Sequence, residues 1–246
     1  MIQITAILEI IINIALLSEI IPLIFCILFY KKFNTRILEV FFVYAILQAL
    51  FIVLISVNGY VYRSLPTNNL LLRFHLIFEY TLIAYLLSLL IVNKLIKKLL
   101  VFSILPFFVY NLLDFLSYGN VEFSNTPTIV EFLIFIVFII IFFFEKMQND
   151  SKILIYNTVS FWICVGLFVY CTGNFFYILL VENFKNASID SKNQLKIVYS
   201  IVTILKNIIL GLSLTSLNLD DKSSEDNLNF PSDLNLDAFT PNHKLN

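Results

Sequence analysis

The chain has 246 residues, of which 59% are hydrophobic and 13% carry charged side chains. A soluble domain has about half its residues apolar and about a quarter charged, so this chain has too little polar surface to cover a globule in water. The composition therefore excludes a soluble enzyme, a disordered protein and a secreted disulfide-rich scaffold. It indicates an integral membrane protein whose partner is the lipid bilayer.

Net charge and cysteine usage narrow the remaining classes. The formal net charge is −1, so no basic field attracts nucleic acid and we expect no nucleic-acid partner. Cys26, Cys164 and Cys171 all lie in apolar runs, and the chain has no Cys-x-x-Cys pair. We expect them to be small buried side chains rather than disulfide partners or zinc ligands, and we expect no metal and no other cofactor.

Seven apolar stretches are long enough to cross a bilayer, whose core of about 30 Å requires about 20 helical residues. They cover about residues 4–30, 37–57, 70–93, 98–117, 127–144, 153–180 and 197–217. Their interiors are apolar at successive positions, which excludes the strict alternation of a membrane β-barrel. We predict an all-α bundle of seven transmembrane helices formed by residues 1–217. Residues 218–246, rich in Asp, Asn and Ser, predict a short, flexible, disordered acidic tail.

The distribution of basic residues predicts the orientation of the bundle. The first stretch lacks a positively charged start and carries Glu9 and Glu19, so we expect a retained helix rather than a signal peptide. The first, third and fifth joints between stretches hold eight Lys and Arg residues, and the second, fourth and sixth hold four. Cytoplasmic loops are enriched in Lys and Arg. We therefore expect the N-terminus outside and the tail in the cytoplasm.

Several charged and polar residues fall inside the apolar stretches, where each charge costs a few kcal/mol. His75 and Glu79 are four residues apart, on one helix face, and we expect the preceding Arg73 to extend to the outer interface. Asn111, Asp114 and Glu131 also fall at the outer ends of their stretches, whereas Lys206 lies near mid-depth. We expect these groups to converge in the outer half of the bundle. The predicted ligand-binding residues are His75, Glu79, Asp114, Glu131, Lys206 and Asn207.

Four readings of this cluster are open. Lys206 pairs with Glu79 or Glu19, and His75 with Glu79, only to fix helix packing. Alternatively, the groups line a hydrated pocket that opens outside and binds a small polar or cationic ligand. They could also move protons or ions, or carry out catalysis. Catalysis is the less favoured of these, because the spans hold a single histidine and no nucleophile elbow, phosphate loop or zinc-protease motif occurs.

A second pattern runs along the sixth stretch. Its members recur at steps of four, four, three and four, which places them on one helix face: Trp162, Gly166, Tyr170, Gly173 and Tyr177. Small residues between large aromatic ones allow two helices to approach closely. We interpret the face as a helix-packing seam, with an aromatic wall for a bound ligand as the alternative.

Trp162, the run from Gly173 to Phe176, and Lys206-Asn207, together with His75, Glu79 and Glu131, resemble the pattern of a known group. Its members are uncharacterised bacterial proteins of similar length that are predicted to cross the membrane seven times. The resemblance covers about residues 1–217 and brings no established activity. It implies a multi-pass protein of the bacterial cytoplasmic (inner) membrane, in which the Trp162 and Lys206 motifs are shared features.

These observations lead to a functional hypothesis. We predict a receptor-like or signalling component that binds a small ligand from the outer side and passes the change inward. The tail has six acidic residues against two lysines, so a basic cytoplasmic or membrane signalling protein is the partner this role implies, although a merely solvated tail is the alternative. A membrane-embedded enzyme acting on lipid and a small transporter are the rival functions.

Overall fold

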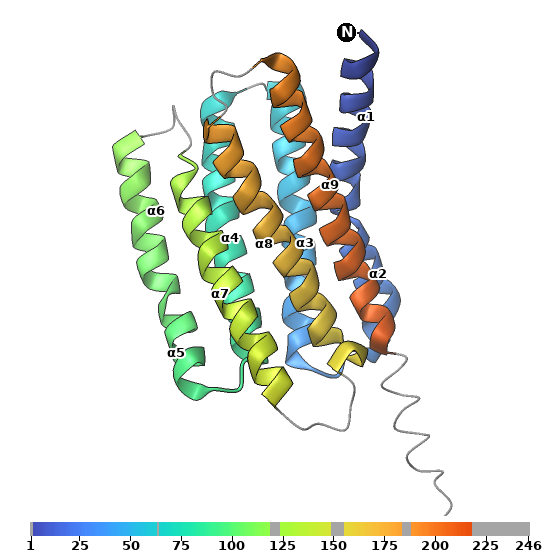
Figure 1. Cartoon of the computed structure of the whole chain (residues 1–246), viewed down its shortest axis with the longest axis vertical. Coiled ribbons are helices and arrows are strands. Elements are labelled where there is room, and N and C mark those ends of the chain that lie inside the picture. Colours follow the sequence, from blue (N-terminus) through green and yellow to red (C-terminus); the bar gives the residue numbers. More distant parts are fainter. Residues whose placement is uncertain (1, 63, 119–123, 149–154, 184–187, 218–246) are drawn as a thin grey trace, which may run out of the picture.

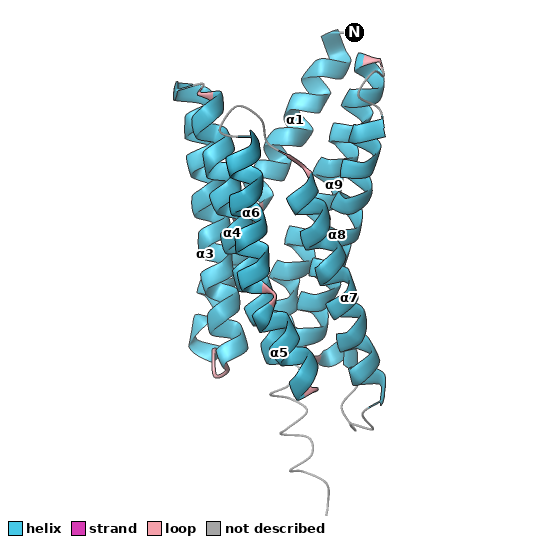
Figure 2. Ribbon diagram, turned by 90° about the vertical axis from the view of Figure 1, so that its left-hand side faces the viewer, coloured by secondary structure: helices cyan, strands magenta, loops and turns pink. Residues whose placement is uncertain are grey.

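The computed structural model describes residues 2–62, 64–118, 124–148, 155–183 and 188–217. These residues are almost entirely helical, and none of them lies in a strand (Figures 1 and 2). Seven helical segments in this part of the chain are long and apolar enough to cross a membrane. The predicted all-α, seven-helix bundle is thus confirmed, and the chain has the architecture of a multi-pass membrane protein. The predicted tail lies outside the described residues.

The seven spans run in alternating directions along one common axis, and the first and fourth spans each consist of two consecutive helices (Figure 1). The helices are α1 Ile2–Ser18, α2 Ile21–Phe29, α3 Arg36–Val57, α4 Leu65–Leu90, α5 Lys94–Phe102, α6 Ile104–Tyr118, α7 Thr126–Gln148, α8 Val159–Asn183 and α9 Ile189–Ser213. The start of α1, the α3–α4 joint and the starts of α7 and α9 lie at one end, here called the N-terminal end. The α2–α3 and α4–α5 joints lie at the opposite end. Figure 2 shows α3, α4 and α6 on one side of the bundle and α8 and α9 on the other.

Prolines divide the first and the fourth span into two helices each. Pro22 lies in the first turn of α2, and Pro106 lies near the start of α6. Proline has no N–H to donate, and its ring clashes with the carbonyl four residues earlier, so a helix breaks just before it. The first break places Glu19 between α1 and α2, so this residue belongs to neither helix.

Three helices start at positions that differ from the predicted apolar stretches. Helix α4 begins at Leu65 because the Ser64 side chain accepts a hydrogen bond from Thr67 N at 3.4 Å. Helix α9 begins at Ile189 because Ser188 caps it in the same way, through Ser191 N at 3.3 Å. By contrast, α8 begins only at Val159. An apolar stretch marks the part of a helix that contacts lipid, whereas caps decide where the helix itself begins.

Glycines bring α8 and α9 into close contact. A Cβ atom added at Gly173 would lie 2.5 Å from Val202 Cγ1, and one added at Gly166 would lie 2.8 Å from Leu210 Cδ2. The two backbones therefore approach more closely than any larger residue would allow. Trp162, from the same predicted face, is 38% exposed, and its indole N–H donates to the backbone oxygen of Tyr156 at 2.7 Å.

The half of the bundle away from the N-terminal end has an apolar core. The rings of Tyr80 and Phe107 stack with centroids 3.7 Å apart, and Phe135 stacks on Tyr80 at 5.0 Å. Phe142 is completely buried nearby on α7. At the very end, Glu145 accepts hydrogen bonds from the backbone N–H groups of residues 92 and 93 and so closes the turn between α4 and α5. The packing of apolar and aromatic side chains stabilises this half of the bundle.

Candidate ligand-binding cavity

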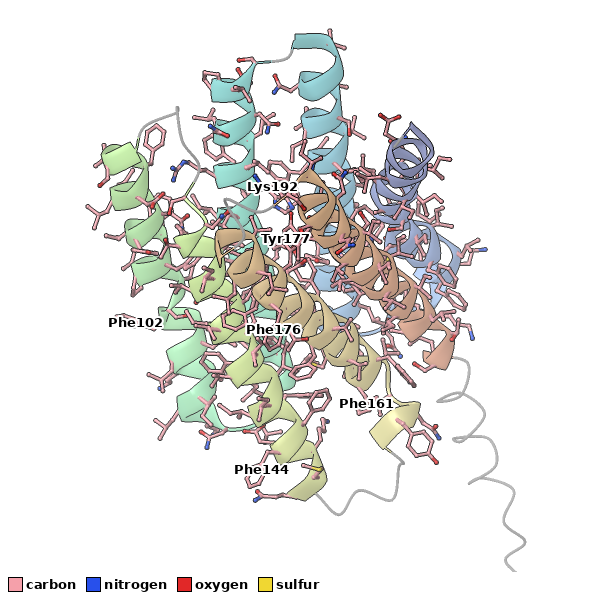
Figure 3. The ribbon with its side chains drawn as sticks, turned by 45° about the horizontal axis from the view of Figure 1, so that its top comes forward. Phe102, Phe144, Phe161, Phe176, Tyr177 and Lys192 are labelled. Carbon is pink, nitrogen blue, oxygen red and sulfur yellow. The ribbon has the colours of Figure 1, made fainter. Side chains whose placement is uncertain are left out.

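A cavity of about 430 Å³ lies in the half of the bundle toward the N-terminal end. This volume is within the range of about 300–1,000 Å³ typical of small-molecule sites. The walls come from α1, α3, α4, α7, α8 and α9. The polar residues that line the cavity are Glu19, Gln48, His75, Glu79, Asn125, Thr128, Tyr170, Asn174, Tyr177 and Tyr199. Figure 3 shows Tyr177 on α8 toward the same end of the bundle as Lys192 on α9.

One wall is a hydrogen-bonded group that joins α3 to α4. The Gln48 side-chain amide donates to Glu79 Oε1 at 3.0 Å. Since the amide nitrogen is used in this way, the Gln48 oxygen accepts from His75 Nε2, 2.8 Å away. The other imidazole nitrogen lies 3.5 Å from Glu79 Oε2. His75 and Glu79 therefore share one face of α4, as predicted, and Gln48 holds both of them in position.

The opposite wall contains a buried ion pair that joins the first span to the last. Lys206 is 1% exposed, and its ammonium group donates to both oxygens of Glu19 at 2.9 and 3.0 Å. The next residue, Asn207, donates to Ser18 Oγ at 2.9 Å. Of the two partners predicted for Lys206, the structure selects Glu19. The break between α1 and α2 makes this possible, because it turns Ser18 and Glu19 toward α9.

Asp114 lies outside the cavity, so the prediction that it converges with the other polar groups on one site is wrong. It pairs with Arg73 Nη1 at 2.5 Å, on the side of the bundle formed by α4 and α6, and it does not line the cavity. The expectation that Arg73 extends to the interface is wrong: its side chain is buried, and its guanidinium also lies over the Phe115 ring at 5.6 Å. Two opposite charges on neighbouring helices satisfy one another more fully than one cation reaching toward water.

Glu131 is completely buried on α7 beside the cavity. Neither of its carboxyl oxygens has a hydrogen-bond partner among the described residues. Its helix neighbours Thr128 and Phe132 line the cavity. Polar side chains buried in a protein are nearly always hydrogen-bonded. A carboxyl group without a donor, next to a cavity, therefore indicates a place where another molecule binds.

Aromatic rings form the remaining part of the wall. The Lys206 ammonium lies 4.6 Å from the centre of the Tyr170 ring, and Phe132 meets the same ring edge-on at 5.4 Å. The rings of Tyr177 and Tyr199 lie 4.9 Å apart. The predicted face of α8 thus contributes glycines to the contact with α9 and tyrosines to the cavity.

The structure brings together most of the predicted binding residues, but in different roles. His75 and Glu79 line the cavity, Lys206 and Asn207 hold the α1–α2 break against α9, and Glu131 lies behind the lining. Sequence reasoning left Gln48 without a partner and did not single out the lining residues Asn125, Thr128 and Tyr199. No cluster of three or more metal-ligating side chains occurs in the part of the chain that the structure describes. No protein-family model, curated protein or solved structure matches this chain.

Proposed function

We propose that this multi-pass membrane protein is a receptor-like component that binds a small polar ligand in the central cavity. The observation that carries the proposal is the cavity itself, which collects polar side chains from helices far apart in the sequence. Intramembrane ionisable residues are expensive to keep, and they mark binding or transport sites more often than chance allows. In a bundle made only for packing, the same positions are filled at lower cost by apolar side chains.

The proposal places the mouth of the cavity on the outer side of a bacterial cytoplasmic membrane. The excess of Lys and Arg at the α2–α3, α4–α5 and α7–α8 joints supports an outward-facing N-terminal end. The resemblance to bacterial seven-span proteins supports the compartment. With this orientation, a ligand reaches the cavity from outside, and residues 218–246 enter the cytoplasm.

The ion pair between Lys206 and Glu19 offers a route for the signal. Glu19 lines the cavity, and Lys206 is on α9, which ends at Ser213 at the opposite end of the bundle. A ligand that competes for Glu19 changes how α9 packs against α1 and α2. Binding is then linked to a movement of the helix that leads into the tail.

Accessibility of the cavity to water is the direct test. A cysteine at Thr128, inside the cavity, is expected to react with a membrane-impermeant cationic methanethiosulfonate reagent added to intact cells. The three native cysteines are fully buried and are expected to stay unreactive. The matched control is a cysteine at Leu133, which lies on the same helix but is exposed on the outer surface of the bundle.

The expected result is labelling of Thr128→Cys at a rate at least about tenfold above that of Leu133→Cys, because thiols ionise in water and not in lipid. Equal rates at the two positions would contradict a water-filled cavity. Labelling of Thr128→Cys only in inverted vesicles would contradict the proposed orientation and leave the cavity intact.

The signalling part of the proposal has a separate test. Deletion of residues 218–246 is expected to leave a folded bundle that still binds its ligand but no longer retains a cytoplasmic partner in co-purification. Partner retention by the truncated protein would contradict a role for the tail.

A further inference from the structure

Among the described residues that line the cavity, the buried side-chain atom without a hydrogen-bond partner is the oxygen of Asn174. Both oxygens of Glu131, behind the lining, and the hydroxyl oxygen of Tyr44 on α3 are also buried without a partner. Asn174 is 2% exposed and lines the cavity. Carboxylate and amide oxygens are hydrogen-bond acceptors. What the cavity lacks is therefore a hydrogen-bond donor.

The two carboxyl groups that line the cavity, those of Glu19 and Glu79, differ in their neighbours. The Lys206 ammonium group donates hydrogen bonds to both carboxyl oxygens of Glu19. Glu79 instead has a neutral amide and one imidazole as its neighbours. Charges in a membrane interior are stable when they are paired, so this arrangement favours a ligand that is positively charged.

We infer that the ligand carries a protonated primary amine, whose ammonium group binds against Glu79 and Asn174. This inference rests on the proposed function, since it names the class of molecule that enters the same cavity. A primary ammonium provides a positive charge and three N–H donors in one small group. It supplies both properties that the described walls lack.

The rest of the cavity sets the character of the remainder of the ligand. Beyond its acidic, amide, imidazole and hydroxyl groups, the lining includes the rings of Tyr170, Tyr177 and Tyr199 and aliphatic side chains of α3 and α4. Aromatic rings attract a cation to their faces and pack against apolar groups. The ligand is thus an amine with a compact apolar or aromatic body.

Three probes of similar shape separate charge from hydrogen bonding. They are 2-phenylethylammonium, its N,N,N-trimethyl analogue and 2-phenylethanol, each titrated into the purified full-length protein in lipid nanodiscs. The primary ammonium is expected to bind at least about tenfold more tightly than either of the others, since a hydrogen bond to a charged group contributes about 1.5–3 kcal/mol. Equal affinity of the alcohol would overturn the inferred charge, and equal affinity of the trimethyl compound would overturn the inferred N–H donors.

Variants locate the charge within the cavity. In Glu79→Gln and in Asn174→Leu, affinity for the primary ammonium is expected to fall about tenfold, while affinity for the alcohol stays the same. The matched control is Glu9→Gln, which removes an exposed carboxyl group at the same end of the bundle and is expected to change affinity less than about twofold.

The outcomes separate this inference from the proposed function. Failure of all three probes to bind would overturn the amine class, and cysteine labelling at residue 128 would then decide independently whether the cavity is open to water. Binding of the ammonium that is indifferent to both Glu79→Gln and Asn174→Leu would place it outside the cavity and overturn the inference. The comparison of the three probes on the native protein needs no variant to fold.

Discussion

The two halves of the bundle satisfy their buried groups in opposite ways. Toward the α4–α5 joint, residues such as Phe142 and Leu100 fill the interior with apolar atoms, and the carboxylate of Glu145 caps two backbone N–H groups. Toward the N-terminal end, the interior contains the carboxyl groups of Glu19, Glu79, Asp114 and Glu131, the Lys206 ammonium group, the Arg73 guanidinium group and a cavity. Acceptors on Glu131 and Asn174 stay without partners there.

This difference indicates that the apolar half contributes mainly to stability and the polar half mainly to binding. Most polar groups in the apolar half are satisfied by their neighbours, although the buried Tyr44 hydroxyl has no hydrogen-bond partner among the described residues. The polar half contains groups that its own side chains leave unsatisfied, which is the signature of a site rather than of a core. Variants in the two halves are therefore expected to differ in what they change, as well as in how much.

The largest expected effect is the loss of one partner of the buried ion pair. Lys206→Met leaves the carboxylate of Glu19 buried without its cation, which is expected to lower the free energy of unfolding by about 3–5 kcal/mol. Unfolding of the purified protein in mixed micelles measures this effect. The double variant Lys206→Met with Glu19→Gln is expected to recover most of the loss, because no uncompensated charge remains. A double variant as unstable as the single one would contradict a cost caused by the unpaired charge.

A core deletion in the apolar half is expected to have the next largest effect. Phe142→Ala removes a fully buried ring. Lipid chains are as apolar as the ring, so the variant loses mainly packing contacts, and we expect about 2–3 kcal/mol rather than the larger values seen in water-soluble proteins. Ligand affinity is expected to stay unchanged at a temperature at which the variant is folded. A loss of affinity without a loss of stability would break the distinction between the halves.

Close packing of α8 against α9 provides a third comparison. Gly173→Ala places a Cβ atom within 2.5 Å of Val202, and the separation this forces is expected to cost about 2 kcal/mol. It is also expected to weaken ligand binding, because Tyr177 lies one helical turn away on the same helix. Gly59→Ala is the matched control: a Cβ atom there meets nothing within 4 Å. Similar melting temperatures for the two variants would contradict the close contact.

The smallest effect is expected at Trp162. Its indole group is partly exposed and makes one hydrogen bond, to the backbone of Tyr156. Trp162→Phe keeps a ring on the surface and loses that bond, so the free energy of unfolding is expected to fall by about 0.5–1 kcal/mol. A loss as large as that of Gly173→Ala would show that Trp162 takes part in the packing of the bundle.

Several contacts of the site follow a rule that the sequence already contains. In two antiparallel helices, residues at similar distances from the joint lie at the same depth. Gln48 and Glu79 lie on either side of the α3–α4 joint in this way, and so do Arg73 and Asp114 around the α4–α5 joint. Gly173 and Val202 are likewise related across the joint between α8 and α9. The prediction that the Arg73 side chain extends to the interface was wrong because it considered only the depth of Arg73 in the membrane. It did not consider the carboxyl group of Asp114, which faces Arg73 from α6.

The sequence by itself determined the class of protein, the seven helices and the polar residues that they bury. Hydrophobic length and the cost of charge in lipid act on each helix separately, so no partner has to be known. Only the tertiary structure decided that Glu19 rather than Glu79 pairs with Lys206, and that Asp114 stays outside the cavity. Glu19 and Lys206 are 187 residues apart, and no joint relates their depths. Their meeting depends on the helix break before Pro22 and on how the first and last spans close the bundle.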